Sequence, residues 1–479
     1  MTSTIKKKAV KGVVWTITEK FGVQGIRFVL GIVLARLLTP EDFGLVGMVT
    51  VFFTLAQVFV ESGFGQAYIQ KKTVTEIDAN TVFYTNLVIS IIVYAILWLT
   101  APYIARFYNQ MELIEITRIL GLVIIINSFV IIQISQITRN VNFKKKAKIT
   151  LISVLISGLA GVISAIYGLG VWSLVIQQMT NRLLFAIILW ITSKWKPSLN
   201  FSFKSLKSMF SFGSWILLSG IIRKFFDNIY ILAIGKFFPA SAVGFYTKAK
   251  QFNSKASQEL SNAVGVVSFP IFSVWQEDKI KLQNGMRKFL KHTMIFVMPL
   301  MVVLIVVAEP FVILLLKEKW APMIPYLQLL CLAGLLYPLH SVNIEVLKAQ
   351  GKSKINFKLN IIKNILRIVN ILITYRWGVL YIIFGEVIVS IISLIINTYY
   401  TKKFINYGLF DQFKDIYIII LGALIASITG YIISSLFINL WYILFAGTLA
   451  TLSIYIVFQY IFNNKFFIET IRLKDNFYN

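Results

Sequence analysis

The sequence contains few of the residues on which soluble enzymes and metal-binding proteins rely. It has one cysteine, Cys331, so an intrachain disulfide and a cysteine metal cluster are excluded. Its two histidines, His292 and His340, are too far apart in the chain to indicate a zinc site. We find no nucleophile–base pair, no glycine-rich phosphate loop and no metal-ligand spacing. The sequence therefore predicts a protein that is not an enzyme and that binds no cofactor.

Charge is also scarce, and most of it is positive. Charged residues make up only 14% of the 479 residues, whereas hydrophobic residues make up 57%, and the mean hydropathy is +0.77. Apolar runs recur that are about 20 residues long, enough for a helix to cross about 30 Å of hydrocarbon. Because backbone groups in a bilayer must bond within the protein, these runs predict an all-α, polytopic membrane protein.

Fourteen membrane-spanning helices are predicted from these runs. The first six are Lys11–Leu37, Phe43–Ala67, Thr81–Arg106, Ile114–Thr138, Ile149–Gly168 and Val171–Thr192. The next six are Ser211–Phe237, Val243–Phe269, Lys288–Ala308, Pro325–Lys348, Ile355–Tyr375 and Val379–Tyr400. Tyr417–Phe437 and Leu440–Phe462 complete the set.

An internal repeat is visible when the chain is displaced by 200 residues. Since the first helix then matches the seventh, an even shift, the sequence predicts two six-helix lobes related by a parallel pseudo-two-fold axis. The predicted parts are an N-terminal lobe (residues 1–195), a C-terminal lobe (196–403), and two additional helices with a cytoplasmic tail (404–479). The matching positions are Trp15 with Trp215, Gly44 with Gly244, Gly65 with Gly265, and the hairpin Ala35–Gly44 with Gly235–Gly244.

The formal net charge of +27 comes mainly from Lys and Arg in short loops on one side of these spans. Lys6–Lys8 and Lys144–Lys146 lie on that side, whereas the turns Thr39–Asp42 and Tyr167–Gly170 on the other side carry no cation. The positive-inside rule therefore predicts that both termini lie in the cytoplasm. The basic loop Trp275–Lys291 is expected to form an amphipathic helix on the membrane surface. Because the charge follows topology, nucleic acid is not an expected partner.

Polar side chains interrupt several of the predicted spans. Ser211–Phe237 carries Arg223, Lys224 and Asp227 near its middle, where one charge costs about 2.5–3.5 kcal/mol on insertion scales. Arg223 and Asp227 are four residues apart and could form a buried ion pair on one helix face. The alternative is that these side chains line a hydrophilic pathway inside a helix bundle. The last two predicted helices carry no charge in their cores.

Cations outnumber anions among the intramembrane side chains, and these side chains belong to the two predicted lobes. We therefore expect a polar cavity between the lobes that accepts an anionic cargo, because arginine and lysine hold phosphate strongly in a low-dielectric cleft. Lys20, Lys248 and Lys348 are expected instead to extend toward the membrane surface. The candidate substrate-binding residues are Gln24, Arg27, Arg182, Arg223, Lys224, Lys250, Lys363 and Arg367.

Two carboxylates in the same spans, Asp227 and Glu386, are candidates for coupling transport to H⁺ or Na⁺. For Asp227, a salt bridge to Arg223 is an equally good interpretation. His340 is expected to be a buried or interfacial histidine with satisfied hydrogen bonds, not a proton relay.

Five motifs follow one another along the chain: LARLLTPEDFGLVGM (Leu34–Met48), VGFYTKAKQF (Val243–Phe252), SFPIFS (Ser268–Ser273), EPFVILLLKEKWAPMIPYLQLL (Glu309–Leu330) and EVLKAQGKSK (Glu345–Lys354). They resemble those of Wzx-type flippases. These proteins serve lipopolysaccharide and polysaccharide biosynthesis and belong to the multidrug/oligosaccharidyl-lipid/polysaccharide exporter superfamily. One position departs from the pattern: Lys317, in LLLKEKW, stands where a small residue, often glycine, is expected.

The resemblance implies two six-helix lobes around a V-shaped cavity that opens by alternating access. It implies as cargo a polyprenyl-diphosphate-linked oligosaccharide, an O-antigen, capsule or exopolysaccharide unit, which is turned from the inner to the outer leaflet of the cytoplasmic (inner) membrane. Membrane lipid is then a further partner, with a polysaccharide polymerase and glycosyltransferases as candidates.

Other functions remain open from the sequence. A cation-coupled multidrug exporter of the same fold would need a cavity of net negative charge, which is opposite to the pattern found. A flippase for the lipid-linked peptidoglycan precursor would share the cationic cavity. A membrane-embedded polysaccharide polymerase would require a large outer loop, and the sequence predicts none. A purely structural scaffold also remains open.

Overall fold

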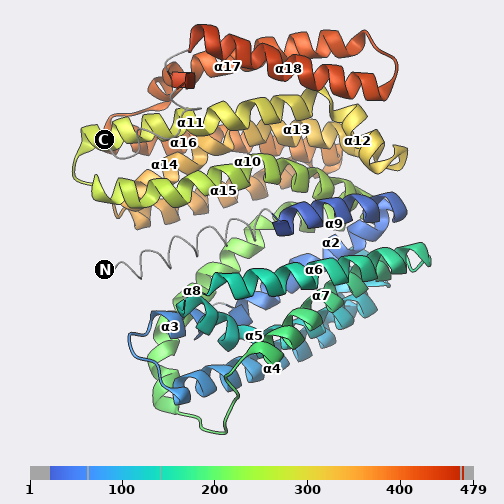
Figure 1. The fold of residues 1–479 in the computed structure, drawn as a ribbon, viewed down its shortest axis with the longest axis vertical. Helices are drawn as coiled ribbons and strands as arrows, with labels where there is room; N and C mark the ends of the chain where they lie inside the picture. The colour runs from blue at the N-terminus through green and yellow to red at the C-terminus, as the bar shows by residue number, and fades with distance from the viewer. Residues whose placement is uncertain (1–21, 62–63, 141, 464–465, 469–479) are drawn as a thin grey trace. The chain divides into compact units, whose positions relative to one another are not determined.

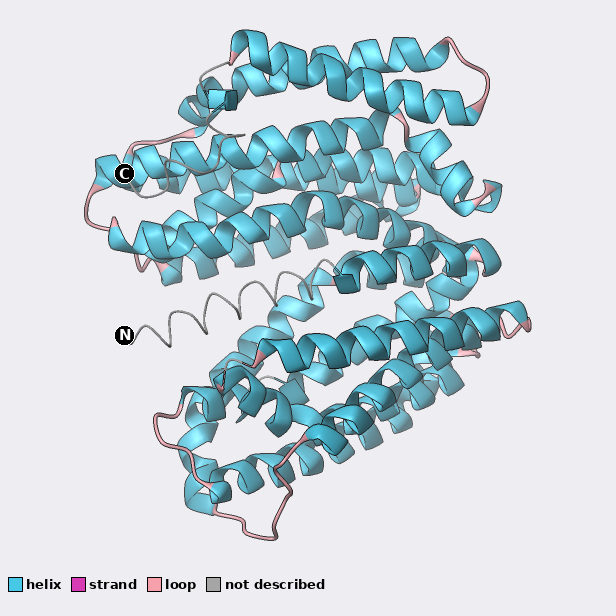
Figure 2. Ribbon diagram, viewed as in Figure 1, coloured by secondary structure: helices cyan, strands magenta, loops and turns pink. Residues whose placement is uncertain are grey.

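The computed structural model describes residues 22–61, 64–140, 142–463 and 466–468. This part of the chain forms helices and loops without a β-strand, so the all-α prediction is confirmed for it (Figures 1 and 2). The chain divides into two compact units, Met1–Gly244 and Phe245–Asn479. Helix α10 (Ala240–Val274) begins in the first unit and continues in the second. The predicted division at residues 195 and 403 concerns the internal repeat and stays a prediction.

The first unit is arranged around α2. This helix packs against α4, α5, α7 and α8, while α4 with α5 and α6 with α7 form the most extensive helix pairs. Buried side chains of α3, α4, α5 and α8 form one hydrophobic cluster, which includes Phe64, Phe83 and Ile132. Besides the helical residues 22–37, the helices are α2 (Pro40–Glu61), α3 (Phe64–Gln70), α4 (Glu76–Tyr108), α5 (Leu113–Arg139), α6 (Phe143–Ile166), α7 (Val171–Thr192), α8 (Phe203–Asp227) and α9 (Ile229–Phe237).

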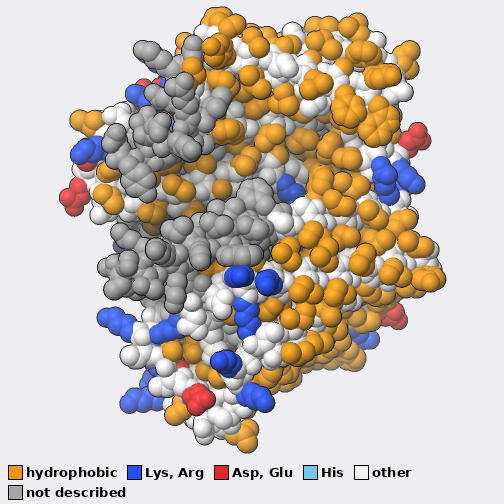
Figure 3. Space-filling model, viewed as in Figure 1, with side chains coloured by type: hydrophobic (Ala, Val, Ile, Leu, Met, Phe, Trp, Pro, Cys, Tyr) orange, Lys and Arg blue, Asp and Glu red, His pale blue; other side chains and the backbone are white. Residues whose placement is uncertain are grey.

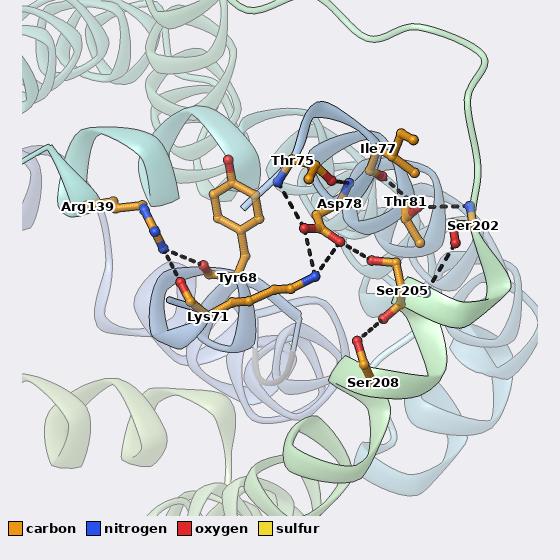
Figure 4. A network of polar contacts seen from close by, with 10 residues as sticks. All are labelled: Tyr68, Lys71, Thr75, Ile77, Asp78, Thr81, Arg139, Ser202, Ser205 and Ser208. Carbon is orange, nitrogen blue, oxygen red and sulfur yellow. Dashed lines mark hydrogen bonds and ion pairs between the residues drawn. The ribbon is translucent and has the colours of Figure 1, made fainter. Parts of the chain in front are cut away.

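The start of α4 is fixed by a capping box and by two neighbouring elements. The Asp78 N–H donates to Thr75 Oγ1 over 3.3 Å, and the Thr75 N–H donates to Asp78 Oδ2 over 3.0 Å, which satisfies two backbone donors at the helix end. The Asp78 carboxylate also accepts from the Lys71 ammonium, 2.7 Å away, and from the Ser205 hydroxyl on α8 (Figure 4). One buried carboxylate thus ties together α4, α8 and the residue that follows α3.

The first turns of α2 and α10 approach more closely than side chains would allow. A Cβ added to Gly44 would lie 1.8 Å from the carbonyl oxygen of Ala240, and one added to Gly244 would lie 1.9 Å from that of Pro40. Positions 40 and 240, like 44 and 244, are equivalent in the predicted repeat, so the contact is reciprocal, as a two-fold relation between the hairpins requires. The complete two-lobe repeat stays a prediction.

The second unit is arranged around α11, which packs against α13, α14, α16, α17 and α18. Buried Met294 and Met298 of α11 cluster with Ile416 and Ala423 of α17 and with Tyr455 of α18. The visible face of α17 and α18 is covered with hydrophobic side chains, as expected for lipid contact (Figure 3). The elements are α11 (Lys279–Val306), α12 (Ala308–Leu316), η1 (Glu318–Met323), α13 (Ile324–Leu335), α14 (Tyr337–Ala349), α15 (Ser353–Thr374), η2 (Tyr375–Trp377), α16 (Val379–Ile405), α17 (Leu409–Ser435) and α18 (Leu440–Phe462).

An ionic cluster also joins α11 to α17. Arg287 Nε donates to Asp415 Oδ2 over 2.6 Å, and the Tyr407 hydroxyl donates to the same oxygen over 2.7 Å. Lys291 Nζ lies 3.5 Å from Asp415 Oδ1. Burial, together with the bond to Asp415, raises the pKa of the Tyr407 hydroxyl above its ordinary value. Helix α17 is therefore held to α11 by charge as well as by apolar packing.

Most residues of each predicted span are helical where the structure describes them. Ten helical segments in the described part of the chain are long and apolar enough to cross a membrane, so a multi-span membrane protein is confirmed, while the count of fourteen stays a prediction. The four predicted spans outside those ten are the first, seventh, eighth and eleventh, namely Lys11–Leu37, Ser211–Phe237, Val243–Phe269 and Ile355–Tyr375. Each of these carries intramembrane charges, and the first is described only from residue 22.

Two predicted spans are divided into shorter helices. Ser211–Phe237 is interrupted at Asn228, whose side-chain amide donates to the Lys224 carbonyl over 2.8 Å and so competes with the helix backbone. Pro325–Lys348 is interrupted at Leu336, where Pro338 in the first turn of α14 cannot donate the next helical bond.

The prediction of a separate surface helix at Trp275–Lys291 is wrong, because residues 279–291 form the first part of the longer helix α11. Asp278 caps α11 by accepting from the Lys281 N–H over 3.0 Å, and this bond lowers the pKa of the Asp278 carboxyl. Helix α11 is 28 residues long in all, and it continues without a break into the membrane-spanning part. Its first turns are amphipathic because Leu282 is buried and Lys281 is exposed.

Candidate functional site

The first unit brings two of the candidate arginines near each other. Arg27 lies on the helical residues 22–37 and Arg182 on α7, and their positive charges repel one another. Gln24, one turn before Arg27, is half-buried. Two guanidinium groups from separate helices thus share one region of the unit, as expected for a place where an anion binds.

The other candidates of this unit lie at the end of α8. Arg223 and Asp227 are exposed, and Lys224 is half-buried beside the break at Asn228. Asn228 Nδ2 also lies 3.4 Å from Thr54 Oγ1 of α2. The charges therefore stand at a helix end that is held against the centre of the unit. The Arg223–Asp227 ion pair stays a prediction.

In the second unit, Glu386 of α16 has a partner that the sequence did not indicate. The Tyr246 hydroxyl on α10 donates to Glu386 Oε2 over 3.0 Å. The Lys250 ammonium lies 5.4 Å from the centre of the Tyr246 ring, within the range of a cation–π contact. The candidate coupling carboxylate and one candidate cation therefore meet on the same tyrosine.

His340 of α14 has both ring nitrogens satisfied, as predicted. Its Nε2 lies 3.0 Å from Ser390 Oγ, and its Nδ1 lies 3.1 Å from Asn397 Nδ2. The positive charges of Lys363 and Arg367 on α15 act on this ring, and they also repel each other. The two candidate cations of α15 therefore share one region of the second unit with a polar cluster from α14 and α16.

Three further cations had been expected to extend to the membrane surface. Lys248 does not, because it is only 6% exposed, so that prediction is wrong for this residue. Lys348 is paired with Glu345 over 2.8 Å on α14. Lys20, like Glu19 beside it, lies outside the described residues.

The candidate residues thus form separate sets within each unit, and their convergence on a common cavity stays a prediction. Within the described ranges, no group of three or more His, Cys, Asp or Glu side chains is placed to hold a metal ion. Sequence reasoning missed Tyr246, Ser390 and Asn397, because uncharged polar residues are common in membrane helices. No pattern in the amino-acid sequence distinguished these three residues from other polar residues.

A family model for polysaccharide biosynthesis proteins matches residues 33–325, more than half of the chain. The chain belongs to this family. Its resemblance to Wzx-type flippases is confirmed by relatives in bacteria. Teichuronic acid biosynthesis protein TuaB of Bacillus subtilis (strain 168) is 27% identical over 361 residues, 74% of both chains.

A second relative carries the name of the predicted class. Lipopolysaccharide biosynthesis protein WzxC of Escherichia coli (strain K12) is 26% identical over 408 residues, 84% of this chain and 82% of the relative. Among solved structures, the lipid II flippase MurJ in an inward closed conformation matches with a TM-score of 0.76. That match covers 95% of this chain and 99% of MurJ at 15% identity, so it shows a shared fold. These matches are consistent with a multi-span membrane protein of the polysaccharide biosynthesis family.

Proposed function

We propose that this polysaccharide biosynthesis protein is a flippase for a polyprenyl-diphosphate-linked oligosaccharide. The cargo would be an O-antigen, capsule or exopolysaccharide unit, moved from the inner to the outer leaflet of the cytoplasmic membrane by alternating access. Membership of the family, the MurJ-like fold and the positive side chains on membrane helices support this proposal.

The observation that carries the proposal is the placement of two arginines on separate helices of the first unit, Arg27 on residues 22–37 and Arg182 on α7, near enough for their like charges to act on each other. Two like charges in a membrane protein are costly, since charges there are worth far more than in water. A diphosphate placed between them would replace the repulsion with two attractions, and guanidinium groups bind phosphate oxygens in pairs. Gln24 on the same helix segment would donate to phosphate or sugar oxygens.

The second unit would contribute a comparable set. Lys363 and Arg367 repel each other on α15 and would attract the same diphosphate, or acidic sugars, at another stage of transport. The hydroxyl and amide groups around His340 are of the kind that bind sugars. Lys250 would add charge beside Tyr246.

We further propose that Glu386 couples transport to H⁺ or Na⁺, with Asp227 as the second candidate. Glu386 accepts from Tyr246, so gain or loss of a proton would change how α10 and α16 are joined within the second unit. The Glu386→Gln variant should then transport without responding to an imposed proton or sodium gradient. A gradient response equal to that of the unchanged protein would contradict this role.

The function can be tested with the full chain in liposomes. The probe is a fluorescent undecaprenyl-diphosphate trisaccharide, and an impermeant reductant applied outside measures the fraction that has crossed. The Arg27→Gln/Arg182→Gln variant should flip the probe at least about tenfold more slowly, because two charge-assisted contacts to the diphosphate are lost. Arg27→Lys should retain intermediate activity, because it keeps the charge but not the fork.

Arg376→Gln is the matched control, since Arg376 is an arginine of η2 outside the membrane-spanning helices. It should leave the rate unchanged. Equal rates for the double variant and the control would refute the assigned role of the arginines. Failure of the unchanged protein to flip the probe, combined with export of ethidium from the same liposomes, would indicate a multidrug exporter.

A further inference from the structure

A cavity of about 660 Å³ lies at the end of the first unit where α3, α5 and α7 end and α6 begins. Its volume is in the range of small-molecule binding sites, about 300–1,000 Å³. None of the candidate transport residues lines it. The lining residues are Tyr68, Val74, Gln133, Gln136, Ile137, Arg139, Asn140, Asn142, Lys145, Leu189, Thr192, Ser193, Lys194 and Trp195.

The charge of this cavity has one sign. Three of the lining residues are cations, Arg139, Lys145 and Lys194, and none is a carboxylate. The Gln and Asn side chains of the wall add amide donors, and Lys and Arg side chains gather toward the end of the first unit at which α3 lies (Figure 3). This composition suits an anion whose oxygens accept several hydrogen bonds.

The three cations have different roles. Arg139 Nη1 donates to the carbonyl oxygens of Tyr68, Ile69 and Lys71 over 3.2, 3.2 and 2.6 Å, and Nη2 donates to that of Lys72 over 2.8 Å. Figure 4 shows its guanidinium directed at the backbone that ends α3. Arg139 therefore holds the cavity wall in place and supplies positive charge, while its NH₂ groups are already committed to protein carbonyls.

Lys145 is placed to meet a ligand directly. It lies in the first turn of α6, where Asn142 caps the helix by accepting from the Lys145 N–H. Its ammonium donates to the Thr192 carbonyl, which leaves donors for another acceptor, because an ammonium has three N–H groups. The N-terminus of this 24-residue helix adds a partial positive charge at the same place. Lys194, after α7, is exposed.

The remaining wall is of the kind found at a membrane interface. Val74, Ile137 and Leu189 are apolar, and Trp195 is only 9% exposed. The indole N–H of Trp195 is buried, and no hydrogen bond of it is found in the described part of the chain. Trp and Tyr concentrate where membrane helices end, at the depth of lipid headgroups.

We propose that this cavity binds the anionic phosphodiester headgroup of a membrane lipid, at a site separate from the transport residues. Lys145 and Lys194 would bind the phosphate, the amides would bind the glycerol hydroxyls, and the apolar wall would contact the start of the acyl chains. The absence of a carboxylate from the lining disfavours zwitterionic headgroups, whose ammonium would have no anionic partner.

Native mass spectrometry of the full chain in detergent tests this proposal. Short-chain phosphatidylglycerol is the probe and phosphatidylcholine of the same chain length is the comparison lipid. The Lys145→Gln/Lys194→Gln variant should bind phosphatidylglycerol at least about tenfold more weakly, because two charge-assisted bonds are lost. Lys204→Gln/Lys207→Gln is the matched control, since both lysines are exposed in the first turns of α8 and outside the cavity. It should bind as the unchanged protein does.

A second variant distinguishes loss of lipid binding from loss of folding in the first variant. Gln136→Glu is nearly isosteric and places a negative charge in the wall, so it should also weaken phosphatidylglycerol binding. Competition by glycerol 3-phosphate separates a lipid from a soluble source: binding of this compound without any binding of the lipid would keep the phosphate site and assign it a soluble ligand. Equal phosphatidylglycerol affinity in all variants, or equal binding of the two lipids by the unchanged protein, would overturn the proposal.

Discussion

The turn between α12 and η1 holds a residue in a conformation that it rarely adopts. Lys317 has φ 75° and ψ 168°, a region occupied almost only by glycine because the Cβ of other L-residues meets the neighbouring backbone. This is also the position at which the chain departs from the pattern of Wzx-type flippases, where a small residue, often glycine, is expected. We predict that Lys317→Gly increases stability.

The surroundings of Lys317 show why its backbone does not relax. The Lys317 N–H donates to the Ile313 carbonyl over 2.9 Å, and the Lys317 carbonyl accepts from the Trp320 N–H over 3.1 Å. Leu316 and Trp320, which flank the turn, are fully buried. The conformation is therefore imposed by packing on both sides. The Lys317 side chain itself is exposed, so its removal loses few contacts.

The expected gain follows from two opposing contributions. Holding a non-glycine residue in this region costs about 1–3 kcal/mol. Glycine in turn increases the conformational freedom of the unfolded chain, which costs about 0.5–1 kcal/mol. The net gain is therefore up to about 2.5 kcal/mol, which at about 2 °C per kcal/mol corresponds to a rise of up to about 5 °C in unfolding temperature for units of this size.

Thermal unfolding of the purified protein in detergent measures this gain. Lys317→Ala is the decisive control because it removes the charge and the long side chain but keeps the Cβ. It should show no rise. Asn406→Gly should show a smaller rise, because Asn406, with φ 54°, is of a residue type that tolerates this region. An equal rise for Lys317→Ala, or a fall for Lys317→Gly, would refute the argument from backbone strain.

Two further predictions concern packing and a buried charge, both measured by the same thermal assay. Gly44→Ala should destabilise the protein by at least about 2 kcal/mol, because the new Cβ would collide with a backbone carbonyl, whereas Gly25→Ala, with open space around the new Cβ, should be neutral or stabilising. Asp78→Asn should lower the free energy of unfolding by about 2 kcal/mol. This is less than the loss of about 3–5 kcal/mol when a fully buried ion pair is broken, because the Lys71 side chain is 35% exposed. Asp278→Asn, at the N-cap of α11, should lower the free energy of unfolding by less than Asp78→Asn does. The opposite order would contradict the role of Asp78.

The sequence predicts the bounds of a helix best where an apolar run is preceded by a residue type that commonly begins helices or turns. The predicted spans Val171–Thr192 and Leu440–Phe462 coincide with α7 and α18. Gly170, with φ 51°, and Asn439, which accepts from the Trp441 N–H, mark the two beginnings. The bounds of α11 were missed because its first three turns are rich in lysine, and hydropathy alone separates them from the apolar part of the same helix.

The candidate site was predicted as a set of charges and not as a set of contacts. Charged residues inside apolar runs are visible in a sequence because each is costly there. Their partners are not visible, because the bond between Tyr246 and Glu386 joins residues far apart in the chain. His340 was correctly expected to be satisfied, but nothing in the sequence singled out Ser390 or Asn397. Contacts between residues that lie far apart in the chain are set by helix packing, which local sequence patterns do not encode.

One distribution connects the fold with the proposed transport. All the candidate residues except Arg182 and Glu386 lie on four of the predicted spans, Lys11–Leu37, Ser211–Phe237, Val243–Phe269 and Ile355–Tyr375. By contrast, α17 and α18 are apolar and are anchored on α11. Each of these charges makes insertion of its helix more costly than leucine would. Under the proposed function, a diphosphate attached to a lipid would be a cargo of opposite charge that offsets this cost.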